Sequence, residues 1–148
     1  MKITALEEYG LRCMILFSKD PNTMLTLPEI SAKEGLSLPY AGKLLMRLRK
    51  AGLVKAVRGR NGGFILSRPA DEIYLRDILS ALGDPLYGSH HCDRYSVDEK
   101  SCRHHKNCLV GNLWRLFYQH IESVIEKVTL ADIAAGNLNS AELVNFQT

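Results

Sequence analysis

Residues 25–69 read LTLPEISAKEGLSLPYAGKLLMRLRKAGLVKAVRGRNGGFILSRP. No acidic residue lies between Glu34 and Asp71, although eight Lys and Arg residues do. The 148-residue chain has a net charge of +3, so its other parts carry 11 basic against 16 acidic side chains, a net charge of −5. One basic block on an otherwise acidic protein predicts a polyanionic partner, and we expect that partner to be double-stranded DNA.

Two short helices are predicted in the first half of this block. Thr26 with Glu29 three residues later is a capping-box pattern, and Gly35 suits the end of that helix. Ser37 is predicted to cap the next helix, which ends at Gly52. Four leucines of that helix are expected to face inward: Leu38, Leu44, Leu45 and Leu48. Two helices joined by a tight glycine turn are typical of a helix-turn-helix, whose second helix enters the major groove.

A β-hairpin is predicted directly after the second helix. The β-prone runs LVKAV at 53–57 and FILS at 64–67 are separated by RGRNGG at 58–63. The Asn-Gly-Gly turn supplies positive φ angles at low cost. A hairpin in this place forms the wing of a winged helix, and Arg58 and Arg60 near its tip are placed to enter a neighbouring minor groove.

The side chains of this block indicate how DNA is contacted. Ser37, Tyr40 and Lys43 occupy the first two turns of the second helix and reach base edges or phosphates. Arg47 is predicted to hold a phosphate. The alternative is an ordinary solvated face, because Lys and Arg are normally exposed. The predicted DNA-binding residues are Ser37, Tyr40, Lys43, Arg47, Arg58 and Arg60.

The rest of the chain is predicted to be helical around one irregular loop. Helices are expected over 5–19, 73–82 and 109–128, with one more turn capped by Thr129. The helix over 109–128 is long and amphipathic, so we expect it to pack against a partner helix. The chain therefore divides into a winged helix-turn-helix at 1–83, a loop at 84–108, a dimerisation helix and helical turn at 109–135, and a tail at 136–148. The predicted fold class is mainly α with a small β-hairpin wing.

Three of the four cysteines fall in the loop. Cys92, Cys102 and Cys108 form the pattern C-x9-C-x5-C, and thiolates bind zinc or iron–sulfur clusters. Zinc sites usually show closely spaced cysteine pairs, which are absent here, so wide spacings favour a cluster. Unmetallated thiols acting as a redox switch are the other alternative. Cys13 is predicted to be a small core residue of the first helix. Nearby histidines are possible further ligands: His90, His91, His104 and His105.

Composition excludes several classes of protein. No apolar run approaches the ~20 residues that span a bilayer. The N-terminal segment contains Glu7 and Glu8 rather than a signal-peptide core, so we expect a cytoplasmic protein without a membrane partner. An enzyme using Cys92 with His90 or His91 is disfavoured, because neither a phosphate-cradling loop nor a nucleophile elbow occurs. We expect no catalytic residues and no small-molecule substrate.

The chain resembles the Rrf-two family of bacterial winged-helix regulators over about residues 1–135. The motifs that carry the resemblance are LPEISAKEGLSLPYAGKLLMRLRKAGLV, VRGRNGGFILSRP, the I-x-L-x-D-I run from Ile73 to Ile78, and the three-cysteine loop. The resemblance implies a homodimer whose long helices cross and which binds a palindromic site. It also implies a 2Fe–2S or 4Fe–4S cluster held by Cys92, Cys102 and Cys108, through which redox state, nitric oxide or iron–sulfur status is sensed.

Two departures from the family pattern concern the cluster. Relatives commonly space the thiols about five residues apart, whereas the first gap here is nine. A ligand histidine that follows the third cysteine by three residues in some relatives is Gly111 here. In other relatives an acidic residue of the first helix is the ligand, and Glu8 matches that position in the partner subunit. Glu8 also suits a helix start as a surface acid that compensates the dipole.

Overall fold

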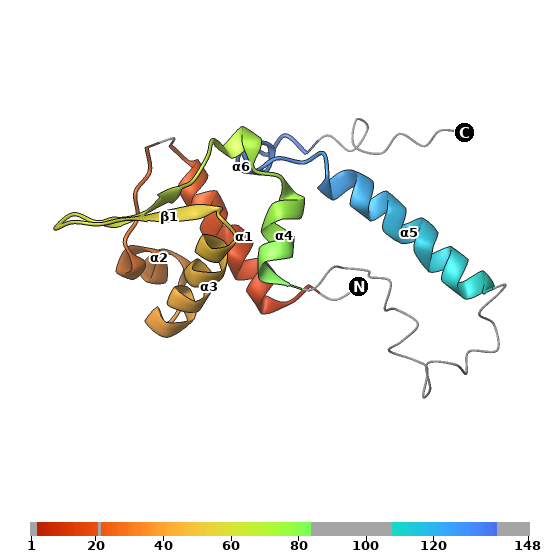
Figure 1. Cartoon of the computed structure of the whole chain (residues 1–148), viewed down its shortest axis with the longest axis horizontal. Helices are drawn as coiled ribbons and strands as arrows, with labels where there is room; N and C mark the ends of the chain where they lie inside the picture. The colour runs from red at the N-terminus through yellow and green to blue at the C-terminus, as the bar shows by residue number, and fades with distance from the viewer. Residues whose placement is uncertain (1–2, 21, 84–107, 139–148) are drawn as a thin grey trace.

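The computed structural model describes residues 3–20, 22–83 and 108–138. Its elements are α1 (Ala5–Ser18), α2 (Leu27–Glu34), α3 (Leu38–Lys50), β1 (Val54–Val57), β2 (Gly63–Leu66), the 3-10 helix η1 (Ala70–Glu72), α4 (Leu75–Leu82), α5 (Leu109–Ile125) and α6 (Leu130–Ala135). The first seven elements and α6 form a head from which α5 projects (Figure 1). The predicted mainly helical architecture with one hairpin is confirmed. No helix within these ranges is long and apolar enough to cross a membrane.

The helix-turn-helix forms where the local signals predict it. Thr26 and Glu29 make the reciprocal capping box at the start of α2, with the Thr26 amide donating to the Glu29 carboxylate at 2.7 Å. Gly35 ends α2 with a φ of 65°, which a side chain would disfavour. The Ser37 hydroxyl then accepts from the Tyr40 amide and starts α3. Two polar N-caps and one left-handed glycine therefore set both ends of α2 and the start of α3.

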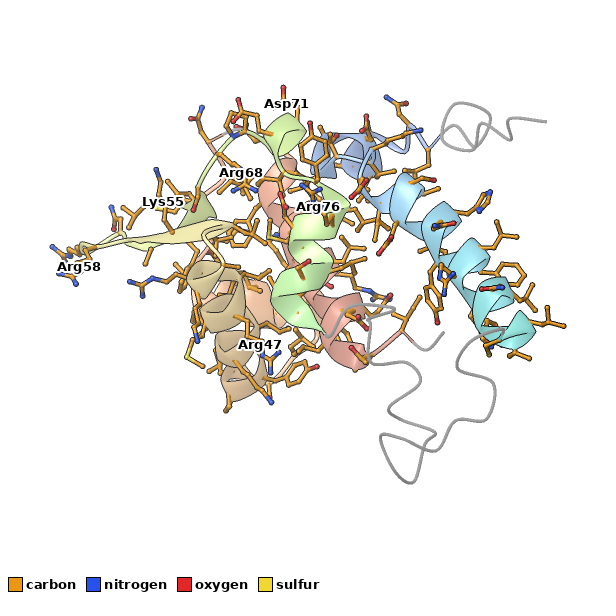
Figure 2. All side chains as sticks on the ribbon, turned by 45° about the vertical axis from the view of Figure 1, so that its right-hand side comes forward. Arg47, Lys55, Arg58, Arg68, Asp71 and Arg76 are labelled. Carbon is orange, nitrogen blue, oxygen red and sulfur yellow. The ribbon has the colours of Figure 1, made fainter. Side chains whose placement is uncertain are left out.

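The wing is a two-stranded antiparallel hairpin in which Val54 pairs with Leu66 and Val57 with Gly63. It extends away from the head, and Arg58 lies at its far end (Figure 2). The prediction that the Asn-Gly-Gly segment supplies the positive φ is wrong, because that angle occurs at Gly59, at 133°. Gly62 has a steric role instead: a Cβ there would lie 2.5 Å from the Val57 carbonyl oxygen.

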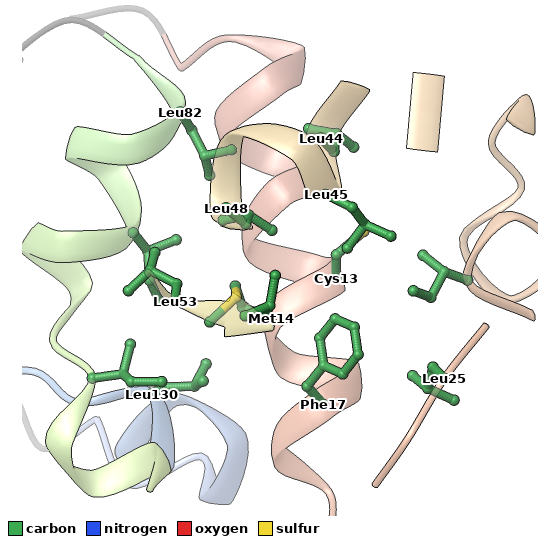
Figure 3. Close-up of a cluster of buried hydrophobic side chains, with 14 residues drawn as sticks. Cys13, Met14, Phe17, Leu25, Leu44, Leu45, Leu48, Leu53, Leu82 and Leu130 are labelled. Atoms are coloured by element: carbon green, nitrogen blue, oxygen red, sulfur yellow. The ribbon is translucent and has the colours of Figure 1, made fainter. Parts of the chain in front are cut away.

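The hydrophobic core lies between α1, α3, α4, β1 and α6 (Figure 3). Its largest fully buried side chains include Phe17 and Met14 of α1 and three predicted leucines of α3: Leu44, Leu45 and Leu48. The prediction for Leu38 is wrong, since this side chain is 48% exposed. The buried stripe of α3 begins one turn later, at Ala41, so the first residue of the helix lies beyond the edge of the core.

Backbone pairing joins the segment between α5 and α6 to the segment before α4. The Leu75 amide donates to the Val128 carbonyl and the Leu130 amide to the Ile73 carbonyl, both at 2.8 Å. Tyr74 and Thr129 thereby form an antiparallel bridge. The helices predicted over 73–82 and 109–128 consequently have different limits: α4 begins at Leu75 and α5 ends at Ile125. Both flanking segments are extended because they pair with each other.

Replacement of Thr129 by Ala is expected to lower the free energy of unfolding by about 1 kcal/mol at neutral pH, because the cap of α6 is lost. Hydrogen bonds from the Thr129 hydroxyl and amide hold the pKa of Asp132 below its usual value. That part of the stabilisation is complete at neutral pH and disappears as the pH falls through the lowered pKa. The deficit of Thr129→Ala should therefore shrink below about pH 4.

Urea denaturation at pH 7 and pH 3 measures this difference. Thr23→Ala is a matched control, because the Thr23 side chain makes no hydrogen bond to the described part of the chain. A Thr129→Ala deficit that grows on acidification would contradict the assignment of the cap to ionised Asp132.

Candidate nucleic-acid interface and cysteine site

The outer face of α3 is basic and free of acids. Lys43, Arg49 and Lys50 are exposed, and none of them forms an ion pair with another described residue. The residues that hold α3 in place lie on its opposite face, among the buried leucines. This face of α3 thus offers unpaired cations to a polyanion. Phosphates of DNA bind such cations by displacing counterions.

The wing carries a second group of cations. Lys55, Arg58 and Arg60 are exposed, and none has an ion-pair partner in the described ranges. Lys55 and Arg58 point into solvent along the hairpin (Figure 2). The structure therefore presents the wing cations and the outer face of α3 on a single winged head, as the prediction for a groove-reading helix requires.

Arg68 has a different use from the other basic residues of the block. Its guanidinium donates to the Asp77 carboxylate at 2.7 Å and to the Glu72 carbonyl at 3.0 Å. This pair joins the segment after β2 to α4. Arg68 is consequently part of the fold, and charge counting alone could not distinguish it from the exposed cations.

Arg47 also has a partner within the head. Its Nη1 donates to the Leu82 carbonyl at 3.1 Å, at the C-terminal end of α4. A cation there is favourable because the last carbonyls of a helix carry partial negative charge. The bond lets Arg47 hold α3 against α4. The phosphate contact of Arg47 stays a prediction, and we expect the internal role to dominate.

The C-terminal end of α4 is packed closely against α1. A Cβ at Gly10 would come within 2.4 Å of the Leu82 side chain, and a Cβ at Gly83 within 2.6 Å of the Glu7 carboxylate. Glu7 is only 5% exposed and accepts hydrogen bonds from the Thr4 amide and hydroxyl, each at 2.7 Å. From the sequence, Glu7 was used only as evidence against a signal peptide. The Thr4–Glu7 spacing is a capping-box signal that could have identified its structural role.

Glu8 and Tyr40, two of the predicted site residues, are linked through α1. The Glu8 carboxylate is exposed and pairs with Arg12 at 2.8 Å, which raises the pKa of the Arg12 guanidinium through a hydrogen bond and charge attraction. Arg12 lies 5.6 Å from the centre of the Tyr9 ring, and Tyr9 meets Tyr40 edge-to-face at 6.1 Å. Glu8 is thus connected by contacts to the first turn of the recognition helix.

Two cysteines can be placed. Cys13 is fully buried, and burial raises the pKa of its thiol to about 12, so it is a protonated core residue as predicted. Cys108 is half-buried immediately before α5, where its sulfur accepts a hydrogen bond from the Gly111 amide at 3.1 Å. Cys92 and Cys102 lie outside the described residues. The three-cysteine ligand set therefore stays a prediction, with Cys108 as its one placed member.

The long helix α5 exposes a continuous apolar face. None of its residues is buried. Six large apolar side chains are between 41% and 82% exposed: Leu109, Val110, Leu113, Trp114, Leu116 and Phe117. Over the part of the chain that the structure describes, only the C-terminal end of α5 is joined to the head. An exposed apolar face of this extent indicates an interface.

Residues 3–136 match the family model of Rrf2, described as an iron-dependent transcriptional regulator. The chain belongs to the Rrf2 family. Rrf2 relatives include the HTH-type transcriptional regulator IscR of Cereibacter sphaeroides, 30% identical over 147 residues that cover 97% of this chain and 94% of the relative. IscR of Yersinia pseudotuberculosis is 32% identical over 136 residues, covering 90% and 79%. This Rrf2 chain is accordingly a DNA-binding transcription regulator rather than an enzyme.

Solved Rrf2-type structures confirm the fold. CymR of B. subtilis, titled a global cysteine regulator, superposes with a TM-score of 0.72 at 31% identity, covering 92% of this chain and 98% of that one. IscR of T. potens gives a TM-score of 0.72 at 29% identity, covering 98% and 93%. The two neighbours carry different names, CymR and IscR, so more than one named protein shares this fold.

Replacement of Arg58 or Arg60 by Gln is expected to weaken DNA binding similarly on all sequences, because each variant loses one cation. The slope of log affinity against log salt concentration should fall by about 0.9 for each lost phosphate contact. Arg47→Gln is expected to leave this slope unchanged and to lower the free energy of unfolding by about 1 kcal/mol, because it loses an internal hydrogen bond. Fluorescence anisotropy over a salt series and urea denaturation measure both quantities.

Lys127→Gln is a matched control for removal of one positive charge, because Lys127 is exposed, follows the C-terminal end of α5 and belongs to neither α3 nor the wing. Lys127→Gln should change neither the slope of log affinity against log salt concentration nor the free energy of unfolding. A slope for Arg47→Gln reduced as much as that for Arg58→Gln would show that Arg47 contacts a phosphate.

Proposed function

We propose that this Rrf2 protein is a homodimeric transcription regulator whose affinity for a palindromic operator is controlled by an iron–sulfur cluster. The observation that carries the proposal is the position of Cys108. The last cysteine of C-x9-C-x5-C is the residue that caps the helix bearing the exposed apolar face. A ligand at that place joins the cofactor directly to the element that we expect to form the dimer.

The DNA-reading part of the proposal rests on the head. α3 presents unpaired cations opposite its buried leucines, and the hairpin extends two further arginines beside it. A recognition helix in the major groove and a wing in the adjacent minor groove suit this arrangement. Ser37, Tyr40 and Lys43 lie in the first turns of α3, where base edges are reached.

The homodimer follows from the uncovered face of α5. Its apolar side chains, Trp114 and Phe117 among them, find no cover among the described residues. A second copy of α5 offers the same face, and a two-fold axis makes a self-complementary contact between them. Two heads held by one such axis read two half-sites of opposite orientation, which is a palindrome.

The residues that would hold the cluster are Cys92, Cys102 and Cys108, with Glu8 of the partner as the candidate fourth ligand. Sulfur is the ligand that iron–sulfur clusters require, and the Gly111 amide already donates to the Cys108 sulfur. A bound cluster supplies chemistry that responds to oxidation, to nitric oxide and to iron supply. To serve as a ligand, Glu8 has to leave Arg12, with which it is now paired.

Contacts between α5 and the head would transmit a change at the cysteines to the DNA-binding surface. α5 is fastened to the head by the Tyr74–Thr129 bridge and by a 3.5 Å ion pair between Arg76 and Glu126. A shift of α5 at Cys108 therefore moves the two heads relative to each other and alters their spacing on DNA. Linkage requires the converse, so operator binding would change the affinity for the cluster.

Thiol-based regulation without a cluster is the second candidate function. A specific observation supports it: CymR of B. subtilis superposes as well as IscR of T. potens does, and CymR of Staphylococcus aureus has been solved in an oxidized form. A zinc-stabilised regulator is a further form of this alternative. Metal analysis separates the three cases, because only the cluster contains both iron and sulfide.

Replacement of Cys92, Cys102 and Cys108 by Ser together is expected to abolish iron and sulfide binding and to make DNA affinity independent of redox conditions. The physical reason is that serine oxygen is a poor ligand for these clusters compared with thiolate sulfur. Anaerobic purification with iron and sulfide quantitation, followed by operator titration with and without an oxidant, measures both effects. Glu8→Ala should weaken retention of the cluster in the same assay.

Cys13→Ala is the matched control, because Cys13 is buried and protonated and should leave iron content unchanged. Operator affinity that responds to redox conditions in the triple Ser variant as it does in the parent would rule out sensing by these cysteines. One zinc per chain, with neither iron nor sulfide, would favour the zinc alternative.

Replacement of Leu113 or Phe117 by Glu is expected to convert the dimer to a monomer, because each variant would bury a charge in an apolar interface. Operator binding should weaken strongly as the second head is lost. Analytical ultracentrifugation gives the mass of the assembly. Gln119→Glu introduces the same charge on the polar side of α5 and should remain dimeric; a monomer there, or dimers of all three variants, would contradict an interface at this face.

A further inference from the structure

We infer that Met46 reads a thymine in the operator by contact of its side chain with the C5 methyl group. This inference rests on the proposed binding of α3 in the major groove and deepens it by assigning a specificity residue. Met46 is 65% exposed, more than any other large apolar side chain of residues 3–83. A single exposed apolar residue is ordinary on a protein surface, so its surroundings decide the case.

Met46 lies in the middle of the face of α3 that points away from the core. The buried stripe consists of Ala41, Leu44, Leu45 and Leu48. Lys43, three residues before Met46, and Lys50, four residues after it, are its neighbours on the helix surface. Both lysines are exposed, and neither is paired with any described residue. When these two cations engage DNA, Met46 is held between them against the groove.

The chemistry of this face leaves little choice of contact. Pro39 and Gly42, seven and four residues before Met46 on this face, have no side-chain hydrogen-bonding group. Met46 has no donor and only a weak acceptor, so it cannot distinguish bases by hydrogen bonding. The one apolar group on the major-groove edges of the base pairs is the thymine methyl. Contact with that methyl is therefore the base-specific interaction open to Met46.

The spacing along α3 relates this contact to that of Lys43. Three helical residues advance about 4.5 Å along the axis, and successive base pairs are about 3.4 Å apart. If Lys43 bonds a guanine, Met46 reaches a base pair one or two steps away. Each half-site should therefore contain a guanine and a thymine within about two base pairs of each other.

Uracil substitution tests the inference, because deoxyuridine pairs as thymidine does and lacks only the C5 methyl. The operator is first obtained by in vitro selection with the full chain, and each thymine is then replaced singly. At one position of the half-site, the parent protein should bind the uracil operator roughly fourfold more weakly, as expected for loss of one buried methyl-sized group.

Two variants assign the effect to Met46. Met46→Ala should bind the thymine operator about as weakly as the parent binds the uracil operator, and uracil should cause no further loss. Met46→Leu should retain most of the sensitivity to uracil, because it keeps an apolar group. Met24→Ala is the matched control: Met24 is also an exposed methionine, at 40%, but lies outside α3, and this variant should behave as the parent.

The outcomes separate this inference from the proposed function. A selected operator in which no thymine position senses uracil, or a Met46→Ala variant that keeps the full uracil effect, overturns the role of Met46 and leaves sequence-specific DNA binding intact. Selection that enriches no sequence overturns the proposed function and this inference with it. Unchanged thermal unfolding of Met46→Ala, expected for an exposed helical site, shows that the variant is folded.

Discussion

The pairing of residues 73–75 with residues 128–130 is the constraint on which the functional layout depends. Two backbone hydrogen bonds of 2.8 Å connect segments that are more than fifty positions apart in the chain. They place the C-terminal end of α5 on the head, while Cys108 caps the other end of α5. One helix therefore spans the distance between the candidate sensing cysteine and the head. Its apolar face remains available to a second copy along that span.

Within the head, apolar side chains that form the core and charged side chains that face solvent come from different sides of the same elements. The leucines of α3 supply the core, and most cations of residues 35–70 remain exposed without an ion-pair partner in the described ranges. Arg68 and Arg47 depart from this division, because both are used to hold α4. The surface that we propose for DNA is consequently narrower than the basic block itself. It comprises the outer face of α3 and the wing.

Most of the head could be predicted because its signals are local. Each of these signals involves residues only a few positions apart. They are the capping residues, the glycine at the end of α2 and the two β-prone runs on either side of the hairpin turn. One error is local, since the positive φ of the wing turn occurs at Gly59. The extended pairing that shortens α4 and α5 depends on distant segments, because it involves residues 73 and 130. The internal partner of Arg47, which was not predicted, likewise lies 35 positions away. The exposure of Leu38 likewise depends on where the core ends. For the site, Cys108 could be placed, whereas Cys92 and Cys102 stay predictions.

In the wing turn, the residues that set the backbone conformation differ from those that present side chains at the tip. Gly59 adopts a left-handed conformation, and Gly62 leaves no room for a side chain beside the Val57 carbonyl. Between them, Arg60 and Asn61 are exposed and have ordinary backbone angles. Substitutions at these two positions would therefore change the groups that the wing offers to DNA, while the glycines preserve the hairpin. Under the proposed role of the wing, the chemistry of its tip can change at little cost in stability.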